Sequence, residues 1–287
     1  MNRMFGCGLI AGLFLAQSSL SIADTLSVAV LDAAPTIDGV HTEWATSLWQ
    51  EVQVHPAKEG DKKNRTGELT VRVAAGVYGD QFYFAAQWPD KTEDLAYKSW
   101  RWKGKKYKRG KQRDDMFALR FDMGGDFNSC MVSDANYEVD VWVWSAGRSN
   151  KAGLAEDMWH LITLDELENA AEYKTDSGNT VYIKKGRDEG SRIYVNNKPD
   201  RKKNQGKELP GIIMTGTSGG SLADVKAKGV WKDNHWFLEY QRKLDTGNAD
   251  DAVLPRGGQI RGQLAVFNKG YAEHKSVSEE LVFELPE

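Results

Sequence analysis

The sequence has little cysteine, no net charge of consequence, and no long apolar segment after its first residues. Of its 287 residues only Cys7 and Cys130 are cysteines, which excludes a disulfide framework. Beyond residue 23 no run approaches the roughly 18 apolar residues of a transmembrane helix. The formal net charge of -3 gives no overall attraction to nucleic acid. The composition therefore indicates a globular protein that has neither the excess of positive charge typical of nucleic-acid binding nor a transmembrane segment after residue 23.

Familiar catalytic motifs are also missing. The five histidines do not stand in HExxH, HxxxH or HxH spacing, and no GxSxG, P-loop or dinucleotide-binding fingerprint occurs in a strand-to-helix context. The carboxylate pairs Asp114-Asp115 and Asp250-Asp251 occupy turn-like positions. We expect them to be solvated turn residues, with calcium binding or acid catalysis as the alternatives. The sequence thus predicts a protein without catalytic machinery of its own.

The N-terminal segment has the features of an export signal. Residues 1–23 combine Arg3, an apolar run over residues 8–16, and the small residues Ser21 and Ala23 before Asp24. This arrangement predicts a signal peptide cleaved after Ala23, a periplasmic location, and no membrane span after cleavage. Cys130 would then be a single thiol in an oxidising compartment, either buried or functional.

Period-2 alternation of apolar and polar residues dominates the rest of the chain. Ten tryptophans and 28 glycines accompany this pattern, which favours strands and turns. Strands are predicted at residues 26–31, 68–75, 81–88, 116–122, 139–144, 180–184, 192–195, 236–242, 259–267 and 281–285. Helices are predicted only at residues 163–172 and, as a short one, at 42–49. We therefore predict an all-β protein: one antiparallel β-sandwich domain over residues 24–287, with long loop insertions and one or two short helices.

Two polar runs interrupt the strand pattern. Residues 98–113 read KSWRWKGKKYKRGKQR, and residues 184–207 are rich in Lys, Arg, Asn and Gly. Trp100, Trp102 and Tyr107 in the first run could stack on bases, but an exported protein seldom meets nucleic acid. We expect both runs to be exposed loops, and the first to be either solvated or a docking surface for an acidic partner.

Met131 is the most informative single residue. It lies in FNSCMVSD, shortly before the aromatic strand at residues 139–144. It is either a core methionine or a thioether ligand to haem iron. The chain has no CxxCH motif, so a haem would have to be held non-covalently, as haem b, with a second axial ligand from elsewhere.

Several motifs resemble one known group. Asp38-Gly39 with Glu43-Trp44 is similar to the opening of family 9 carbohydrate-binding modules and related sandwiches. The stretches DDMFALRF at 114–121, DVWVWSAGR at 140–148 and WFLEYQRKLDTG at 236–247, with the DD pair at 250–251, resemble one branch of that group. That branch is the haem-binding domain of ethylbenzene dehydrogenase γ subunits and related dimethyl-sulfoxide-reductase-type enzymes.

The resemblance implies a periplasmic β-sandwich that binds one b haem for electron transfer and is not itself a catalyst. Carried over, the iron ligands fall on Met131 and Lys275, with His274 as the alternative to Lys275. Neighbouring strand residues face opposite sides, so only one of His274 and Lys275 can face the haem. Trp142 and Trp144 would pack around the porphyrin or in the adjacent core.

The resemblance also implies a redox partner protein, for which a molybdenum enzyme with an iron–sulfur subunit is a candidate. The rival hypothesis is a carbohydrate-binding module without haem, whose exposed tryptophans stack on sugar rings. A third is an accessory domain that binds neither ligand.

Overall fold

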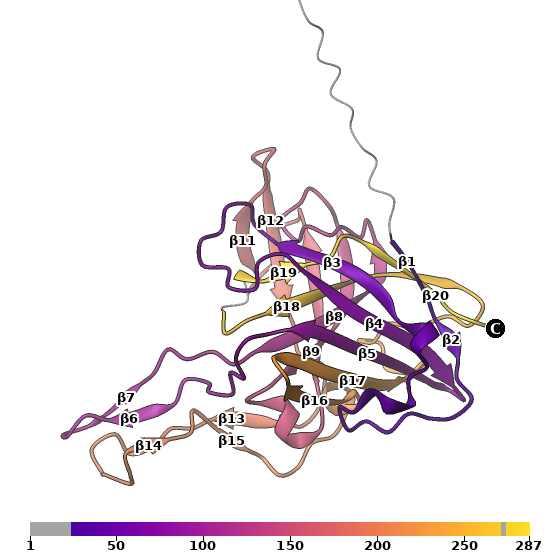
Figure 1. The fold of residues 1–287 in the computed structure, drawn as a ribbon. Helices are drawn as coiled ribbons and strands as arrows, with labels where there is room; N and C mark the ends of the chain where they lie inside the picture. Colours follow the sequence, from indigo (N-terminus) through magenta and orange to yellow (C-terminus); the bar gives the residue numbers. More distant parts are fainter. Residues whose placement is uncertain (1–23, 271–273) are drawn as a thin grey trace, which may run out of the picture.

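Two antiparallel sheets pack face to face in the computed structural model, which describes residues 24–270 and 274–287 (Figure 1). Sheet A has the order β11-β12-β10-β9-β8-β18, and β18 also pairs with β19 and β20. Sheet B has the order β3-β4-β5-β17-β16, and the short β2 runs parallel to β4. The pairing of β19 with β3 makes the two sheets continuous at one corner, while β1 runs parallel to β20.

The strands of sheet A are β1 (Asp24–Ser27), β8 (Met116–Gly125), β9 (Tyr137–Ser145), β10 (Glu156–Thr163), β11 (Ala171–Lys174), β12 (Thr180–Lys185), β18 (Gln259–Phe267), β19 (Ser276–Val277) and β20 (Leu281–Glu284). Those of sheet B are β2 (Ala29–Val30), β3 (Gln50–Pro56), β4 (Leu69–Tyr78), β5 (Gln81–Pro89), β16 (Lys226–Lys232) and β17 (His235–Lys243). The smaller strands β6 (Trp100–Trp102), β7 (Tyr107–Arg109), β13 (Tyr194–Asn196), β14 (Glu208–Leu209) and β15 (Ile212–Met214) lie outside both sheets.

The predicted all-β sandwich is confirmed. Strands form at each of the ten predicted positions. The additional strands are β3, β10 and β16 and the shorter β6, β7, β11, β14, β15 and β19. The helices of the described residues are 3-10 turns of three or four residues: η1 (His41–Glu43), η2 (Thr46–Leu48), η3 (Ser149–Ala152) and η4 (Ser221–Ala223). None of the helices in this part of the chain is long and apolar enough to span a membrane. The predicted signal peptide, residues 1–23, lies outside the described residues.

The prediction of a helix over residues 163–172 is wrong. Thr163 ends β10, and its backbone neighbour Leu164 donates its N–H to the Asn136 side-chain oxygen at 2.8 Å. Ala171 then begins β11, which pairs with β12. The segment contains good helix formers, but the strand pairing on either side of it determines its structure. Tertiary contacts here override local helix propensity. At residues 42–49 two short 3-10 turns replace the predicted helix.

The core between the sheets is unusually aromatic. Its largest fully buried side chains include Trp88, Trp142, Trp144 and Trp236. Burying each large apolar side chain contributes about 1.5–3 kcal/mol. The backbone of β16 comes so close to Trp144 that a Cβ at Gly229 would lie 2.3 Å from its ring, so only glycine fits there.

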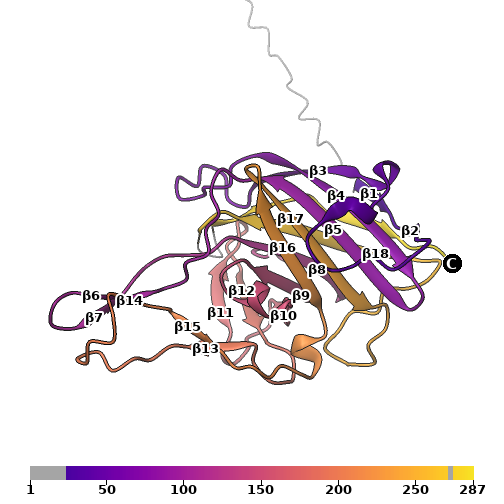
Figure 2. The ribbon, with the colours of Figure 1, turned by 60° about the horizontal axis from the view of Figure 1, so that its bottom comes forward.

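The two polar insertions form a single projecting arm instead of two separate loops. We define the arm as residues 98–113 and 194–214; it extends away from the sandwich at the side of β6, β7 and β14 (Figures 1 and 2). β14 pairs with β6, which pairs with β7, so the second insertion hydrogen-bonds to the first. Tyr107 is fully buried there, and its hydroxyl donates to the Gly206 carbonyl at 2.6 Å. The prediction of exposed loops is therefore right for the cations and wrong for Trp100 and Tyr107, which are buried.

A buried carboxylate fastens the N-terminal segment to sheet B. Glu239 on β17 is fully buried and accepts the N–H of Gly39 at 2.8 Å and the indole N–H of Trp44 at 2.9 Å. Nearby, His41 donates through Nε2 to the Leu238 carbonyl at 3.2 Å, and its ring packs on Trp49. A single glutamate thus holds the segment that resembles the opening of the family 9 modules against sheet B.

This packing predicts a pH dependence of stability. Burial lowers the pKa of His41 from 6.5 to about 4, despite the opposing hydrogen bond to Leu238. Above pH 6.5 the imidazole is neutral in both states, whereas between pH 6.5 and 4 only the unfolded chain takes up the proton. We expect the free energy of unfolding to fall by up to about 3 kcal/mol across this window. Urea denaturation of wild type and His41→Gln at several pH values measures how much of the decrease in unfolding free energy is due to His41. The variant should show a smaller decrease between pH 6.5 and 4. An equal decrease in both proteins would contradict the prediction.

Candidate functional site

The outer face of sheet A is the surface against which Met131, one of the predicted haem ligands, packs. Side chains that pair across neighbouring strands share a face, so the register places Val277, Ala265, Ala118 and Val143 in one row. A second row consists of Gln263, Arg120, Val141 and Met158, and His160 stands opposite Val139 beside it. This face is largely apolar in its middle, with a few buried polar groups among the aliphatic side chains.

Met131 lies in the loop between β8 and β9, which folds back over this face. Its side chain packs against the apolar cluster that contains Val139, Val141 and Met158. Arg120 holds the loop in place by donating from Nη2 to the carbonyls of Asn128, at 2.7 Å, and Ser129, at 2.9 Å. The neighbouring Cys130 is exposed, so of the two alternatives expected for this thiol, buried or functional, the first is wrong.

His274 and Lys275 lie just before β19 and outside any strand, so the alternation expected for them does not decide which of the two faces sheet A. The ring of His274 is engaged by Asp61, with 2.7 Å between its Nδ1 and the carboxylate Oδ2. Lys275 stands two residues before Val277, which packs with Ala265 on the outer face of sheet A. It is also one of the charges that act on His160. Of the two candidates, Lys275 is the one with a link to the face over which Met131 packs, through its charge on His160.

His160 is a polar residue of this face that sequence reasoning missed. It is 8% exposed, and its Nδ1 has no hydrogen-bond partner among the described residues. Burial, together with the charges of Lys185, Arg120 and Lys275, lowers its pKa to about 3. Its position on an unpredicted strand, β10, explains why the spacing of the histidines gave no signal.

Trp142 and Trp144 point the other way. Both are fully buried in the core between the sheets, on the opposite face of β9 from Val141 and Val143. Trp144 donates its indole N–H to the Asn150 side chain at 3.0 Å. A group bound by Met131 would be separated from both rings by the thickness of sheet A. The sequence analysis expected these tryptophans either around the porphyrin or in the adjacent core, and the structure places both in the core.

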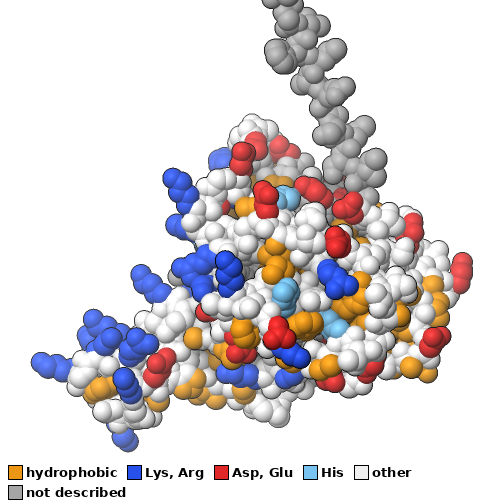
Figure 3. All heavy atoms as spheres, in the orientation of Figure 1, with side chains coloured by type: hydrophobic (Ala, Val, Ile, Leu, Met, Phe, Trp, Pro, Cys, Tyr) orange, Lys and Arg blue, Asp and Glu red, His pale blue; other side chains and the backbone are white. Residues whose placement is uncertain are grey.

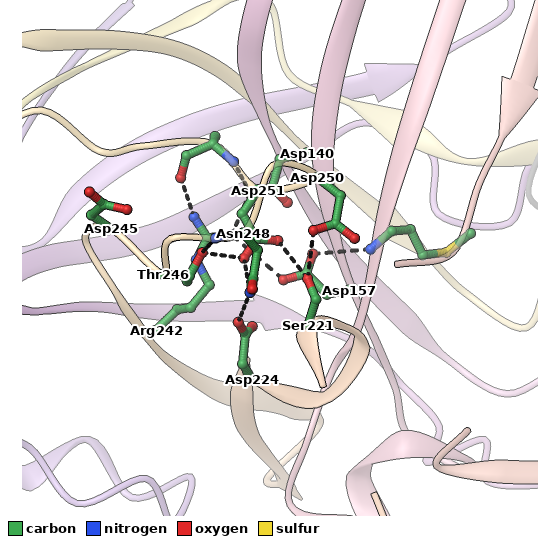
Figure 4. A network of polar contacts seen from close by, with 12 residues as sticks. Asp140, Asp157, Ser221, Asp224, Arg242, Asp245, Thr246, Asn248, Asp250 and Asp251 are labelled. Carbon is green, nitrogen blue, oxygen red and sulfur yellow. Dashed lines mark hydrogen bonds and ion pairs between the residues drawn. The ribbon is translucent and has the colours of Figure 1, made fainter. Parts of the chain in front are cut away.

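A second polar cluster lies on the inner side of the same sheet, around Arg242 (Figure 4). Arg242 is 1% exposed, and its Nη1 lies 2.5 Å from Asp140, 3.6 Å from Asp157 and 3.7 Å from Asp251. Its guanidinium also stacks over the Trp142 ring, 4.6 Å from the centroid. Burial of the guanidinium acts to lower the pKa of Arg242, but the charges of these carboxylates outweigh burial and raise the pKa.

The expectation that the paired carboxylates are solvated turn residues is wrong. Asp114 and Asp115 are fully buried, and Asp114 pairs with Arg148 at 3.0 Å. Asp251 is 6% exposed. Its neighbour Asp250 is half-buried and is the least enclosed of the four carboxylates. These carboxylates are structural partners of N–H donors and arginines.

A family model described as ethylbenzene dehydrogenase matches residues 42–278. The chain belongs to this family. No curated protein matches the sequence.

Solved structures similar to this family member are carbohydrate-binding proteins, at low identity. A putative carbohydrate-binding protein from Bacteroides uniformis is 9% identical, with a TM-score of 0.44 over 92% of this chain and 100% of that one. A family 9 carbohydrate-binding module from Caldicellulosiruptor kristjanssonii in complex with cellotriose is also 9% identical, with a TM-score of 0.38 over 92% of this chain and 95% of that one.

The stretches on which the sequence resemblances rest meet in space. Glu239 of WFLEYQRKLDTG accepts from Gly39 and Trp44, and Arg242 of the same stretch pairs with Asp140 of DVWVWSAGR. These residues join segments about 100 to 200 positions apart in the sequence. These stretches therefore hold the sandwich closed.

Proposed function

We propose that this member of the ethylbenzene dehydrogenase family is a periplasmic electron-transfer protein that binds one b haem and serves a redox enzyme without catalysing a reaction itself. Family membership supports the general role of a subunit of a dehydrogenase system. The observation that supports the proposal is the packing of Met131 over the outer face of sheet A, where the charge of Lys275 acts on the buried His160, while His274 is paired with Asp61.

The residues of this face suit a haem. The thioether of Met131 and the amine of Lys275 can both serve as axial donors for iron, and aliphatic side chains such as Val141 and Val143 offer an apolar surface to a porphyrin. His160 adds a buried imidazole whose Nδ1 lacks a partner among the described residues. When bound, haem supplies one-electron redox chemistry; the protein sets its potential through the axial ligands and by excluding water.

Haem titration of the full chain tests this function. Added haemin should give a sharp Soret band that saturates at one equivalent, with a low-spin visible spectrum. A protein that stays colourless at saturating haemin would overturn the proposal. In that case retention on a polysaccharide column would favour the carbohydrate-binding hypothesis, and absence of both properties would favour an accessory domain.

The arm is the proposed docking surface for the redox partner. Nine lysines and arginines occur in residues 98–113 and five in 196–209, against only Asp200 and Glu208 as acids in these two ranges. Their side chains gather on the projecting end of the molecule, at the lower left of Figure 3. Such a cationic surface attracts an acidic partner over a distance set by ionic strength.

We expect binding through the arm to depend strongly on salt. Affinity for an immobilised polyglutamate peptide, measured by surface plasmon resonance, should fall about tenfold or more between 0.05 and 0.5 M NaCl. Replacing Lys105, Lys106 and Lys108 by glutamine should remove most of that dependence. A matched control replaces three exposed lysines of sheet B, Lys226, Lys232 and Lys243. Equal losses in the two triple variants would contradict a specific role for the arm.

A further inference from the structure

Arg120, on β8, is a buried cation of the outer face of sheet A that has no carboxylate partner in the part of the chain that the structure describes. The residue is 6% exposed, yet it forms no ion pair with any residue of 24–270 or 274–287. The other well-buried arginines differ, since Arg242 and Arg148 are each paired with at least one aspartate. A buried charge without a partner costs free energy, so the position of Arg120 calls for an explanation.

The donors of Arg120 converge on the two peptide groups that lead into Met131. Its Nη2 donates to the carbonyls of Asn128, at 2.7 Å, and Ser129, at 2.9 Å. Gln263 stands opposite Arg120 on β18, is 4% exposed, and donates through Nε2 to the same Ser129 carbonyl at 3.2 Å. Two buried side chains of sheet A thus fix the backbone immediately before Met131.

Aromatic rings hold the guanidinium of Arg120 in place. Its central carbon lies 5.0 Å from the centroid of the Phe127 ring and 5.9 Å from that of Tyr137. The Tyr137 hydroxyl accepts from Nη1 at 3.4 Å and donates to the Asn128 carbonyl at 3.2 Å. Carbonyl dipoles and ring faces are therefore what offset this charge, and they do so less completely than a carboxylate.

The charge of Arg120 acts on the face over which Met131 packs. Arg120 stands opposite Val141, in the row that continues to Met158, and both of these residues belong to the cluster against which Met131 packs. Burial is the main cause of the lowered pKa of His160 on β10, and the charge of Arg120 contributes to it across the intervening β9. Water screens such a charge little, because the groups around it are buried.

We propose that Arg120 is a positioning residue of the haem site, which fixes Met131 through residues 128 and 129 and whose unpaired charge raises the reduction potential of the haem. This inference rests on the proposed function and adds to it a residue that is not an iron ligand. Side chains that orient a metal ligand also determine how well the ligand binds. Reduction of a bound haem adds one negative charge, so a fixed positive charge nearby favours the reduced form. A raised potential suits a protein that accepts electrons.

A spin label on Cys130 tests the positioning role without haem. Cys130 is exposed and is the direct neighbour of Met131 in the loop that Arg120 holds. In the apoprotein, with Cys7→Ser so that one thiol remains, a nitroxide on Cys130 should give narrower electron paramagnetic resonance lines in Arg120→Gln than in wild type. Gln263→Leu should also narrow the lines, because it removes another donor to the same loop.

Potentiometric titration of the haem-loaded protein tests the role of the charge. Arg120→Gln should lower the equilibrium constant for reduction at least about tenfold, which is about 59 mV for a one-electron couple. Gln263→Leu is the matched variant, because it loosens the same carbonyl without removing a charge, and its constant should fall less than about threefold. Arg72→Gln removes an exposed cation of sheet B and should behave like wild type in both experiments.

The possible failures are distinguishable. Line widths that are equal in Arg120→Gln and wild type would overturn the positioning role, whether or not haem binds. An unchanged potential, or an equal fall in Arg120→Gln and Gln263→Leu, would overturn the role of the charge. Wild-type protein that binds no haem would overturn the proposed function and the role of the charge with it. Circular dichroism of each apoprotein checks folding, and Arg120→Met replaces Arg120→Gln if the latter does not fold.

Discussion

The low-spin spectrum of the haem-loaded protein should be lost in Met131→Ala. Removal of the thioether opens one axial position, so the visible spectrum should shift toward the high-spin form and haem affinity should fall at least about tenfold. The side chain is only partly buried on its cluster, so the apoprotein should remain folded. Haemin titration, with far-ultraviolet circular dichroism of the apoprotein, measures both effects.

The same face contains a matched control. Met158 is another partly buried methionine that packs on the cluster under Met131, and Met158→Ala should leave the low-spin spectrum intact. Lys275→Ala should reproduce the Met131→Ala spectrum, whereas His274→Ala should not, because His274 is bonded to Asp61. Identical spectra for Met131→Ala and wild type would show that the iron is bound by other residues, of which His160 is the first to examine.

Replacing Arg242 by methionine should be among the most destabilising single changes in the protein. The variant leaves Asp140, Asp157 and Asp251 buried without their shared cation, and removing one partner of a buried pair typically costs about 3–5 kcal/mol. Urea denaturation at pH 7 measures the loss of unfolding free energy.

Two further variants separate charge from packing. Lys243→Met, at the next position on β17, removes an exposed cation and should change stability by less than about 0.5 kcal/mol. The double variant Arg242→Met with Asp140→Asn should recover part of the loss, because one unpaired carboxylate is removed. A single Arg242→Met variant that loses less than about 1 kcal/mol would show that the carboxyls are neutral in the folded protein.

The fold was largely predictable because one face of most strands is buried. Alternation along β9 places Trp142 and Trp144 on one face and Val141 and Val143 on the other, and such patterns identify strands without knowledge of their partners. β10 escaped because its sequence EDMWHLIT contains buried polar residues, Glu156, Asp157 and His160, which break the expected alternation of apolar and polar residues. The segment at 163–172 misled because helix propensity is local, while the pairing that determines its structure is not.

The candidate site was predictable only in part. Met131 was singled out from its sequence context and Lys275 from a resemblance, and the position of Met131 depends on how the loop between β8 and β9 folds, which no local pattern shows. The network at Arg242 was hidden for a different reason. Asp140, Asp157, Asp188 and Asp251 are far apart in the sequence, and nothing in their local surroundings shows that they are buried together.

The parallel pairing of β1 with β20 has a consequence for folding kinetics. Asp24 stands beside Leu281 and Ser27 beside Glu284, so strands from the two ends of the described chain lie side by side. Their pairing requires closure of a loop that spans almost the whole polypeptide, an entropic cost that must be met before the contacts are formed. Since contacts of such high sequence separation slow folding, this sheet should be completed late, after the chain has emerged in full. A polypeptide of this topology stays incompletely folded for longer, which is compatible with threading through a translocation channel before its sandwich closes.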